Sequence, residues 1–488
     1  MTEKLLYIKL NQANYEYDVH SIVKAFYADK TVKVLTPESK SKAGGNDSIA
    51  FFMEVKLYPE GADMRIGKEE YQWQFENQSE SAGYKDGFKT FLYKSLQNAT
   101  GKSLPWGNLT GIRPTKLAYS MLEEGRSDEE IRDFLERRHF VSRQKADLSI
   151  DIAKRERELL ADVHYEGGYS LYIGIPFCPT TCLYCSFTSY PIAAYRGQVE
   201  AYIDCVIREM EYVSKRYAHK ILDSVYIGGG TPTTLEAEQL DRLILALKSL
   251  FDFSTVKEFT VEAGRADSIT QDKLQVLFKH GVSRISVNPQ TMKQETLDII
   301  GRRATVEQVE KAYALAREVG FTNINMDLIL GLPGETEGDV QNTIDRVVEL
   351  APDSLTVHSL AVKRASRLNQ WIQENGVSML RNTDETMDIA AKGAKRLGME
   401  PYYLYRQKNM SGNFENVGYA KPGKLGLYNI LIMEEKQTIV ALGAGSITKI
   451  VLPNGRIERC DNVKDVALYI EKTDEMIERK RELFSLES

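Results

Sequence analysis

Three cysteines stand close together in this chain, and their spacing points to a metal cofactor. Cys178, Cys182 and Cys185 form a C-x3-C-x2-C triplet directly after the apolar run of residues 172–177. Iron–sulfur cubes that carry electrons are usually held by four cysteines, and no fourth cysteine lies near the triplet. The triplet therefore predicts a [4Fe-4S] cluster in which one iron keeps a position open for another ligand, which indicates chemistry at the cluster.

A zinc site or a chance cluster of buried thiols is the alternative. Structural zinc takes four ligands, commonly from two C-x2-C pairs or from a cysteine pair and a histidine pair. The chain has neither a second cysteine pair nor a histidine close to the triplet. The other cysteines, Cys205 and Cys460, are expected to be packing residues, and Cys205 lies in a segment with the apolar stripe of a helix.

A glycine-rich run, G-G-G-T-P-T at residues 228–233, follows the second predicted strand. Glycines let backbone amides and carbonyls approach a ligand without interference from a Cβ atom. The run therefore predicts a ligand-binding loop. A plain strand-to-helix turn with Thr233 or Thr234 as the N-cap is the alternative.

Polar side chains stand at the ends of later predicted strands. Glu262 is expected to accept hydrogen bonds from ribose hydroxyls or an ammonium group, with a solvated edge charge as the alternative. Asp327 lies within an apolar strand, where a buried acid needs a partner. A structural salt bridge to Arg302 or Arg284 is the alternative reading of this acid. His358, at the end of the sixth strand, is a candidate substrate contact or proton donor, or a core imidazole.

Short apolar strands alternate with helical patterns from about residue 169 onward, and they must position these side chains. The predicted strands are residues 169–177, 222–227, 258–262, 284–287, 323–330 and 354–360. Six strand–helix units in sequence predict a parallel sheet with right-handed crossovers. Six units rather than eight favour an α/β fold with a partial (β/α)6 TIM-like barrel, whose sites gather at the carboxyl ends of the strands.

Segments on either side of this barrel are expected to form further domains. The predicted boundaries are an α/β domain at 1–165, the barrel at 166–382 and an α+β domain at 383–488. Strands are predicted at 5–10 and 50–58, and helices at 127–138 and 144–162. After residue 383 a helix, a loop-rich segment around 402–426, a strand pair and a charged helix are expected.

Composition excludes several classes of partner. A net charge of −6 gives no electrostatic footprint for nucleic acid or for an anionic membrane. No apolar stretch is long enough to cross a bilayer, and the first residues lack a signal-peptide core. Five cysteines in 488 residues do not make a disulfide framework. The chain is therefore expected to be cytoplasmic, reduced and oxygen-sensitive.

The cysteine triplet, with the aromatic Tyr184 just before its last member, resembles the signature of radical S-adenosylmethionine (SAM) enzymes. The resemblance implies that the amino and carboxylate groups of SAM bind the open iron. It also implies that an electron from the cluster cleaves SAM to a 5′-deoxyadenosyl radical.

Further motifs resemble the anaerobic coproporphyrinogen III oxidase branch of these enzymes. They are Y-x-x-I-P-F-C at 172–178, the glycine run, Glu262, R-x-S-x-x-x-Q at 284–290 and D-L-I-L-G-L-P at 327–333. The upstream run L-P-W-G-N-L-T-G-I-R-P at 104–114 resembles the extra N-terminal domain of the HemZ-type subgroup, with a helix start near Pro114 as the alternative.

The resemblance implies two sets of cofactor contacts. The first set would contact the SAM bound to the cluster: Tyr172, Tyr184, Gly229, Glu262 and Ile447. The second would line another SAM site: Gly230, Thr231, Gln290, Arg302, Asp327 and Ala361.

The implied reaction is the oxygen-independent oxidative decarboxylation of coproporphyrinogen III to protoporphyrinogen IX, with a reducing donor such as flavodoxin or ferredoxin. Phe187 stands where the oxidases carry a further cysteine, and the haem carriers also have Phe at this position. The haem carriers have His-Asn where this chain has Tyr428-Asn429. A haem- or porphyrin-delivery protein is thus one alternative. Another radical reaction on a tetrapyrrole, such as methyl transfer with ring opening, is a second.

The segment of residues 402–416 holds a further cluster of Tyr, Arg and Asn side chains. Because arginine pairs with carboxylates and tyrosine packs on aromatic faces, this cluster is expected to seat a flat ring that bears propionates. Ordinary surface-loop composition is the alternative.

Overall fold

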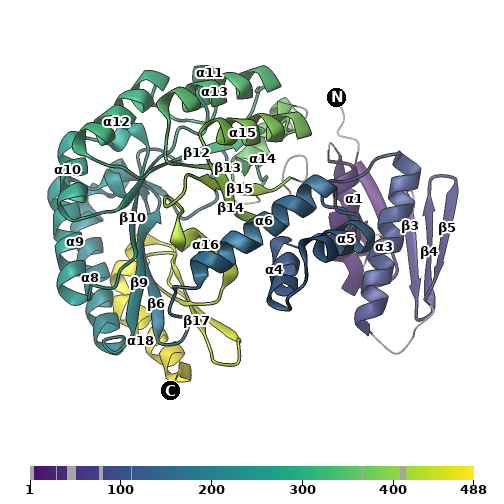
Figure 1. Ribbon diagram of the computed structural model, residues 1–488, viewed down its shortest axis with the longest axis horizontal. Coiled ribbons are helices and arrows are strands. Elements are labelled where there is room, and N and C mark those ends of the chain that lie inside the picture. The colour runs from purple at the N-terminus through teal and green to yellow at the C-terminus, as the bar shows by residue number, and fades with distance from the viewer. Residues whose placement is uncertain are drawn as a thin grey trace. The chain divides into compact units, whose positions relative to one another are not determined.

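A computed structural model describes residues 5–28, 30–40, 51–75, 81–111, 113–363, 366–376, 379–406 and 414–487 (Figure 1). The chain divides into two compact units. The first unit comprises residues 1–153, 370–379 and 405–415, and the second comprises residues 154–369, 380–404 and 416–488. The predicted domain boundaries at 165 and 382 remain a prediction.

The first unit contains a five-stranded sheet in the order β2-β1-β3-β4-β5, with α1 and α3 against it. β1 pairs in parallel with β2 and β3, and β3, β4 and β5 are antiparallel. The predicted strand at 5–10 is confirmed, and the helix predicted from 127 begins after a capping box at Ser127. Its elements are β1 Leu5–Leu10, α1 Glu16–Phe26, β2 Thr31–Leu35, α2 Pro37–Lys40, β3 Met53–Tyr58, β4 Gly61–Ile66, β5 Glu69–Gln74, α3 Ser81–Thr100, α4 Thr115–Glu123, α5 Asp128–His139 and α6 Arg143–Leu160, which continues into the second unit.

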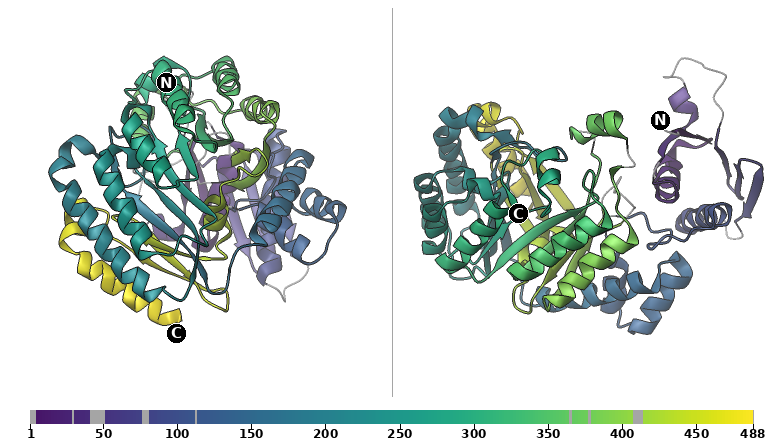
Figure 2. Two further views of the ribbon diagram at one scale, coloured as in Figure 1. Left: turned by 60° about the vertical axis from the view of Figure 1, so that its left-hand side comes forward. Right: turned by 90° about the horizontal axis from the view of Figure 1, so that it is seen from above.

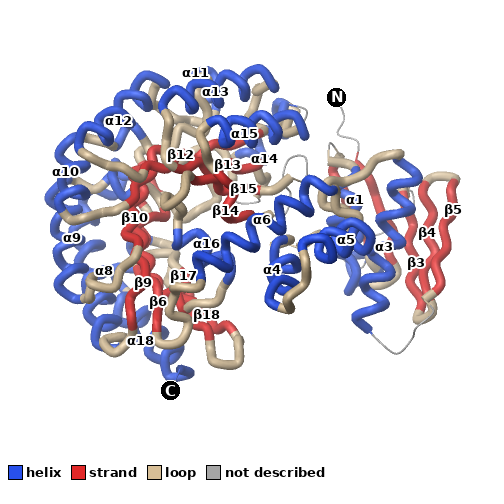
Figure 3. The backbone as a smooth tube through the Cα atoms, in the orientation of Figure 1, coloured by secondary structure: helices blue, strands red, loops and turns tan. Residues whose placement is uncertain are grey.

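The second unit is built on an eleven-stranded sheet in the order β14-β15-β13-β12-β11-β10-β9-β6-β16-β17-β18. Its six middle strands are the six predicted ones, and all pair in parallel. Helices cover the convex face of this curved sheet, and the predicted partial (β/α)6 barrel is confirmed (Figure 3). Most residues of these strands are buried, and they include polar side chains such as Asn325 and Thr356.

The bounds of these elements follow. The strands are β6 Gly168–Ile175, β7 Phe177–Cys178, β8 Tyr190–Pro191, β9 Ile221–Gly229, β10 Glu258–Gly264, β11 Arg284–Val287, β12 Ile324–Leu330, β13 Ser354–Ser359, β14 Glu400–Tyr405, β15 Asn416–Ala420, β16 Thr438–Leu442, β17 Ile447–Val451 and β18 Ile457–Asp461. The helices are α7 Ile192–Tyr195, α8 Val199–Arg216, α9 Ala237–Leu250, α10 Gln271–Lys279, α11 Gln294–Ile299, α12 Val306–Val319, α13 Glu337–Leu350, α14 Leu368–Asn375, α15 Asp384–Arg396, α16 Leu427–Glu434, α17 Val466–Glu471 and α18 Thr473–Phe484.

Strands from the last hundred residues extend the barrel sheet at both edges. β15 pairs with β13, whereas β16 pairs in parallel with β6 and is followed by β17 and β18 (Figure 2). The loop-rich segment predicted around 402–426 was wrong in part, because it contains the end of β14 and all of β15. The predicted strand pair is a set of three strands. Non-local pairing with the barrel edges stabilises β15 and β16, and the local sequence does not reveal it.

No described helix is long and apolar enough to cross a membrane.

Candidate functional site

A cavity of about 460 Å³ opens at the carboxyl ends of the barrel strands. This is within the size range of small-molecule sites. Its wall includes most of the residues that the sequence singled out: Tyr172, Cys178, Cys182, Tyr184, Cys185, Gly229, Gly230, Thr231, Glu262, Gln290, Arg302, Asp327 and Ile447. Ala361, which follows β13, is not among the described residues that line it. The barrel thus brings together segments that are far apart in sequence.

The cysteine loop is tied to its surroundings by hydrogen bonds. The amide of Leu183 donates to the carbonyl of Ile300 at 2.9 Å. The hydroxyl of Thr231 lies 3.5 Å from the sulfur of Cys178. Burial raises the pKa of the Cys178 thiol to about 11, so a bound cation is needed to hold this residue as a thiolate at neutral pH.

Arg265, directly after β10, contacts the cysteine loop, and the sequence analysis did not single it out. Its buried guanidinium donates to the carbonyl of Thr180 at 3.0 Å and lies 3.7 Å from the sulfur of Cys182. Asp267 pairs with the other side of the same guanidinium at 2.6 Å. An arginine three residues after the predicted strand end at 262 was the available signal in the sequence.

The donor set fits a three-cysteine cluster. All five cysteines are free thiols, and the three of the triplet line one cavity together. Within the described ranges, no group of three or more His, Cys, Asp or Glu side chains is placed to hold a single metal ion. A cubane cluster needs no such convergence, because each thiolate binds a different iron atom.

The glycine run lies against the end of the first barrel strand. The amide of Gly230 donates to the carbonyl of Ile175 at 2.7 Å, and a Cβ atom at this position would lie 2.6 Å from the carbonyl oxygen of Phe177. Gly229 has a φ of +103°, which glycine adopts without strain. The N-cap alternative was wrong: Thr233 and Thr234 lie in a 3₁₀ turn, and Glu236 caps α9.

Glu262 faces this cavity beside a stack of tyrosines. The Tyr226 hydroxyl donates a hydrogen bond to its carboxylate, and the ring of Tyr226 stacks on that of Tyr428 at 4.5 Å. Removal from bulk water raises the pKa of Glu262 to about 7, against the lowering effect of the Tyr226 hydroxyl. The carboxyl group is therefore close to half ionised at neutral pH. Tyr226 was missed because it is an ordinary aromatic residue of an apolar strand, and Tyr428 was noted only at the position of the haem carriers' histidine.

Gln290 and Arg302 leave polar atoms without a partner. Gln290 has a φ of +70°, a strained conformation for a residue other than glycine. Its buried side-chain oxygen and the buried Nε of Arg302 have no hydrogen-bond partner within the described structure. Arg302 also lies 3.4 Å from the Tyr184 hydroxyl. Both residues line the cavity, so a polar ligand there could pair with these atoms.

Asp327 pairs differently from the structural salt bridge considered as its alternative. Asn325 donates to its carboxylate at 2.7 Å, and Nε2 of His358 lies 3.9 Å from it. The pKa of Asp327 is lowered, because hydrogen bonding and charge from His358 outweigh desolvation. Arg284 instead donates to the hydroxyl of Ser354 at 2.9 Å. The structure therefore shows His358 as a neighbour of the Asp327 carboxylate in the cavity wall.

Three side chains of the predicted ring-seating segment at 402–416 do not face solvent, whereas Tyr405 is partly exposed, so ring seating by this segment stays a prediction. Tyr402, Tyr403 and Arg406 are buried, and Arg406 donates to the carbonyl of Leu109 at 2.6 Å. Residues 407–413 lie outside the described part of the chain.

The upstream L-P-W-G motif also lies in a buried cluster. The indole of Trp106 donates to Glu415 at 2.7 Å, and Lys145 pairs with the same carboxylate at 2.5 Å. This motif therefore serves packing within the first unit.

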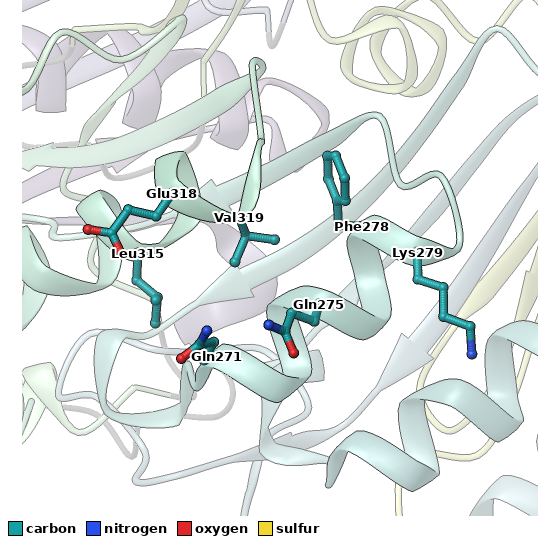
Figure 4. Close-up of a pocket in the computed structure, with 7 residues that line it drawn as sticks. All are labelled: Gln271, Gln275, Phe278, Lys279, Leu315, Glu318 and Val319. Atoms are coloured by element: carbon teal, nitrogen blue, oxygen red, sulfur yellow. The ribbon is translucent and has the colours of Figure 1, made fainter.

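A second hollow, of about 300 Å³, lies on the outer surface between α10 and α12 (Figure 4). Gln271, Phe278, Lys279 and Glu318 are among its lining residues. It is formed by helices that cover the sheet, whereas the strand-end cavity is formed by the loops that carry the motifs. The outer hollow has none of the cysteine or glycine features of a cofactor site.

Comparison with known proteins agrees with this geometry. Residues 172–347 match the model of the Radical SAM superfamily. The chain is 41% identical over 406 residues to the oxygen-independent coproporphyrinogen-III oxidase-like protein HemZ of Bacillus subtilis, which covers 81% of each chain. It is 31% identical to the heme chaperone HemW of the same organism, over 57% of this chain and 70% of that protein.

A solved structure supports the fold. The coproporphyrinogen III oxidase HemN of Escherichia coli, a radical SAM enzyme, superposes with a TM-score of 0.52 and 24% identity over 66% of this chain and 72% of that one. Radical SAM proteins use a [4Fe-4S] cluster and SAM, and the cysteine triplet lies within the matched residues. The chain therefore belongs to the oxygen-independent coproporphyrinogen-III oxidase-like family of radical SAM proteins.

Proposed function

We propose that this protein is a radical SAM enzyme that acts on a tetrapyrrole, by oxygen-independent oxidative decarboxylation of coproporphyrinogen III to protoporphyrinogen IX. The observation that carries the proposal is one cavity that combines a cysteine triplet, a glycine loop and a rim suited to a flat anionic ring. The 41% identity to a coproporphyrinogen-III oxidase-like protein supports the substrate class.

In this proposal Cys178, Cys182 and Cys185 hold the cluster. Tyr172, Tyr184, Gly229, Glu262 and Ile447 contact the SAM bound to it. The bound, reduced cluster and its SAM would supply carbon-radical chemistry for hydrogen abstraction from the substrate. An electron donor such as flavodoxin or ferredoxin would provide the reducing electron.

A second SAM site would use another part of the same wall. Its members in that wall are Gly230, Thr231, Gln290, Arg302 and Asp327. The resemblance adds Ala361, which is not among the described residues that line the cavity. The unpartnered side-chain oxygen of Gln290 and Nε of Arg302 support a polar ligand here. A stoichiometry of two SAM molecules bound per chain would support SAM as that ligand, and a stoichiometry of one would count against it.

The cavity rim supports the substrate class. Phe187 is 70% exposed although it lines the cavity, and Ile447 beside the same opening is 46% exposed. The ammonium of Lys363 lies 5.3 Å from the centre of the Phe187 ring, and Lys464 also lines the opening. An aromatic face with two lysines suits a flat ring that carries carboxylates, because the ring stacks and the carboxylates pair with ammonium groups.

A haem-delivery role is the second candidate, favoured by Phe187 and by the similarity to the heme chaperone. Tyr428, at the position of the haem carriers' histidine, argues against it. Its side chain is buried and stacked on Tyr226, so it offers no accessible iron ligand. Another radical reaction on a tetrapyrrole, such as methyl transfer with ring opening, would differ in product mass.

The test is anaerobic reconstitution with iron and sulfide, followed by SAM, dithionite and coproporphyrinogen III. Deoxyadenosine and tetrapyrrole masses are followed together, with Cys182→Ala as the control that should form no deoxyadenosine. Loss of two carboxyl groups coupled to deoxyadenosine is expected. Deoxyadenosine with unchanged coproporphyrinogen would reject the decarboxylase, and stoichiometric haem binding without turnover would favour delivery.

A further inference from the structure

The loop between β16 and β17 forms one wall of the cavity. Ala444, Gly445, Ser446 and Ile447 all line it. The loop is tightly packed against the segment that follows the cysteine loop. A Cβ atom on Gly445, whose φ is +70°, would lie 2.6 Å from the hydroxyl oxygen of Thr188 in that segment. A small shift of this loop would therefore change the shape of the cavity.

Two buried side chains of α8 hold the start of this loop. Oε2 of Glu209 accepts the amide of Gly443 at 2.8 Å, and the hydroxyl of Tyr202 accepts the amide of Ala444 at 2.9 Å. The same hydroxyl donates to the carbonyl of Gly174 in β6 at 2.6 Å. The amides of the loop are thus fixed by side chains, since its backbone leaves the strand pairing at this point.

Glu209 is itself held by Lys480 of α18, which lies beside α8 (Figure 2). The ammonium of Lys480 lies 2.7 Å from Oε1 of Glu209, and both side chains are 0% exposed. Lys480 also donates to Asn462 at 2.7 Å, and Asn462 donates to the carbonyl of Gly443 at 2.9 Å. The Tyr469 hydroxyl donates to the same glutamate. The ion pair therefore reaches both the amide and the carbonyl of Gly443.

A contribution to folding stability does not by itself explain why Glu209 and Lys480 form a buried ion pair. Two buried charges are expensive to desolvate, and apolar replacements of a complete buried pair are often neutral or stabilising. A charged acceptor, however, makes a stronger and better directed hydrogen bond to a backbone amide than a neutral one. The geometry favours a role in positioning.

We propose that the Glu209–Lys480 pair positions the 443–447 loop, and that through this loop α18 sets the affinity of the cavity for SAM. This inference rests on the assignment of the cavity as the SAM site in the proposed function. Glu209 and Lys480 are positioning residues, because they touch the loop and not the cofactor.

Three variants separate charge balance from the hydrogen bond to Gly443. Lys480→Met leaves a buried carboxylate without its partner. Glu209→Gln/Lys480→Met restores charge balance and keeps an oxygen that accepts from Gly443. Glu209→Leu/Lys480→Met is balanced as well but has no acceptor. The exposed pair of Glu478 and Arg481 on the same helix provides the control Glu478→Gln/Arg481→Met.

Two measurements are made on each full-length variant. Equilibrium dialysis of the reconstituted protein gives the dissociation constant for SAM, and hydrogen exchange follows the amides of Gly443 and Ala444. We expect Glu209→Leu/Lys480→Met to weaken SAM binding about tenfold and to accelerate exchange, as the loss of one good hydrogen bond predicts. Lys480→Met should act in the same direction, because the Glu209 carboxylate loses the ammonium group that orients it toward Gly443. Glu209→Gln/Lys480→Met and the surface control should stay within about twofold of the unaltered protein.

The results separate the ways in which this can fail. Equal SAM affinities in the two balanced double variants would overturn the inference, even if Lys480→Met does not fold. An unchanged hydrogen-exchange rate at the Gly443 amide in Glu209→Leu/Lys480→Met would also overturn the inference, and this measurement needs no cofactor. Failure of the unaltered protein to bind SAM would instead count against the assigned cofactor site.

Discussion

Arg265 lies 3.7 Å from the sulfur of Cys182, and both side chains are buried. The contact joins the end of β10 to the middle of the cysteine loop. Once a cluster is bound, a fixed positive charge at this distance favours its more negative reduced state.

Arg265→Met should therefore lower the reduction potential of the reconstituted cluster by roughly 50 mV, which is close to a tenfold change for one electron. Redox titration followed by electron paramagnetic resonance measures this shift, with iron content as a check on loading. Arg265→Lys keeps the charge and should recover part of the potential. Equal potentials in the Met variant and the unaltered protein would show that the guanidinium only packs the loop.

Glu262 should give SAM binding a pH dependence. Its pKa is raised to about 7, so the group is mainly neutral below pH 7 and mainly a carboxylate above it. If the carboxylate accepts hydrogen bonds from SAM, affinity should rise several-fold between pH 6 and pH 8. Glu262→Gln should remove this rise and weaken binding about tenfold at pH 8. Parallel pH profiles of the two proteins in equilibrium dialysis would contradict the role.

Glu335 should destabilise the fold as pH rises. Burial raises its pKa to about 7, although the Thr291 hydroxyl donates to it. An acid whose pKa is higher in the folded state contributes its full stability below about pH 4.5 and loses it as the pH rises through about 7. Glu335→Gln should therefore raise the free energy of unfolding by roughly 1 to 3 kcal/mol at pH 8 and by less at pH 5.

Urea unfolding at the two pH values measures this difference. The control is Glu349→Gln, which removes an exposed acid of α13 and should change little at either pH. An advantage of Glu335→Gln that is as large at pH 5 as at pH 8 would mean that the effect is packing and not ionisation.

The barrel and the cluster ligands could be predicted because their signals are local. Apolar strands alternate with amphipathic helices along the sequence, and Cys178, Cys182 and Cys185 lie within eight residues of one another. Parallel topology then brings the strand ends together, so Glu262 and Asp327 share the cavity with the cysteines.

Other parts of the site depend on contacts between distant segments, and no local pattern reveals them. Tyr428 reaches Tyr226 because α16 lies on the concave side of the sheet (Figure 3). Asp327 meets His358 because β12 and β13 are neighbours in register, a pairing that competes with the arginines suggested by charge alone. The buried pair of Glu209 and Lys480 joins residues 271 positions apart.

Phe187 should contribute to tetrapyrrole binding without contributing to stability. Its ring is 70% exposed, so Phe187→Ala should leave the melting temperature nearly unchanged, whereas lost stacking should weaken binding of a coproporphyrin by roughly tenfold. Phe278→Ala is the matched control, since Phe278 is 48% exposed but lies on the outer hollow between α10 and α12 (Figure 4). Fluorescence titration of each variant measures affinity. Equal affinities for the two variants would mean that the ring does not bind at the cavity mouth.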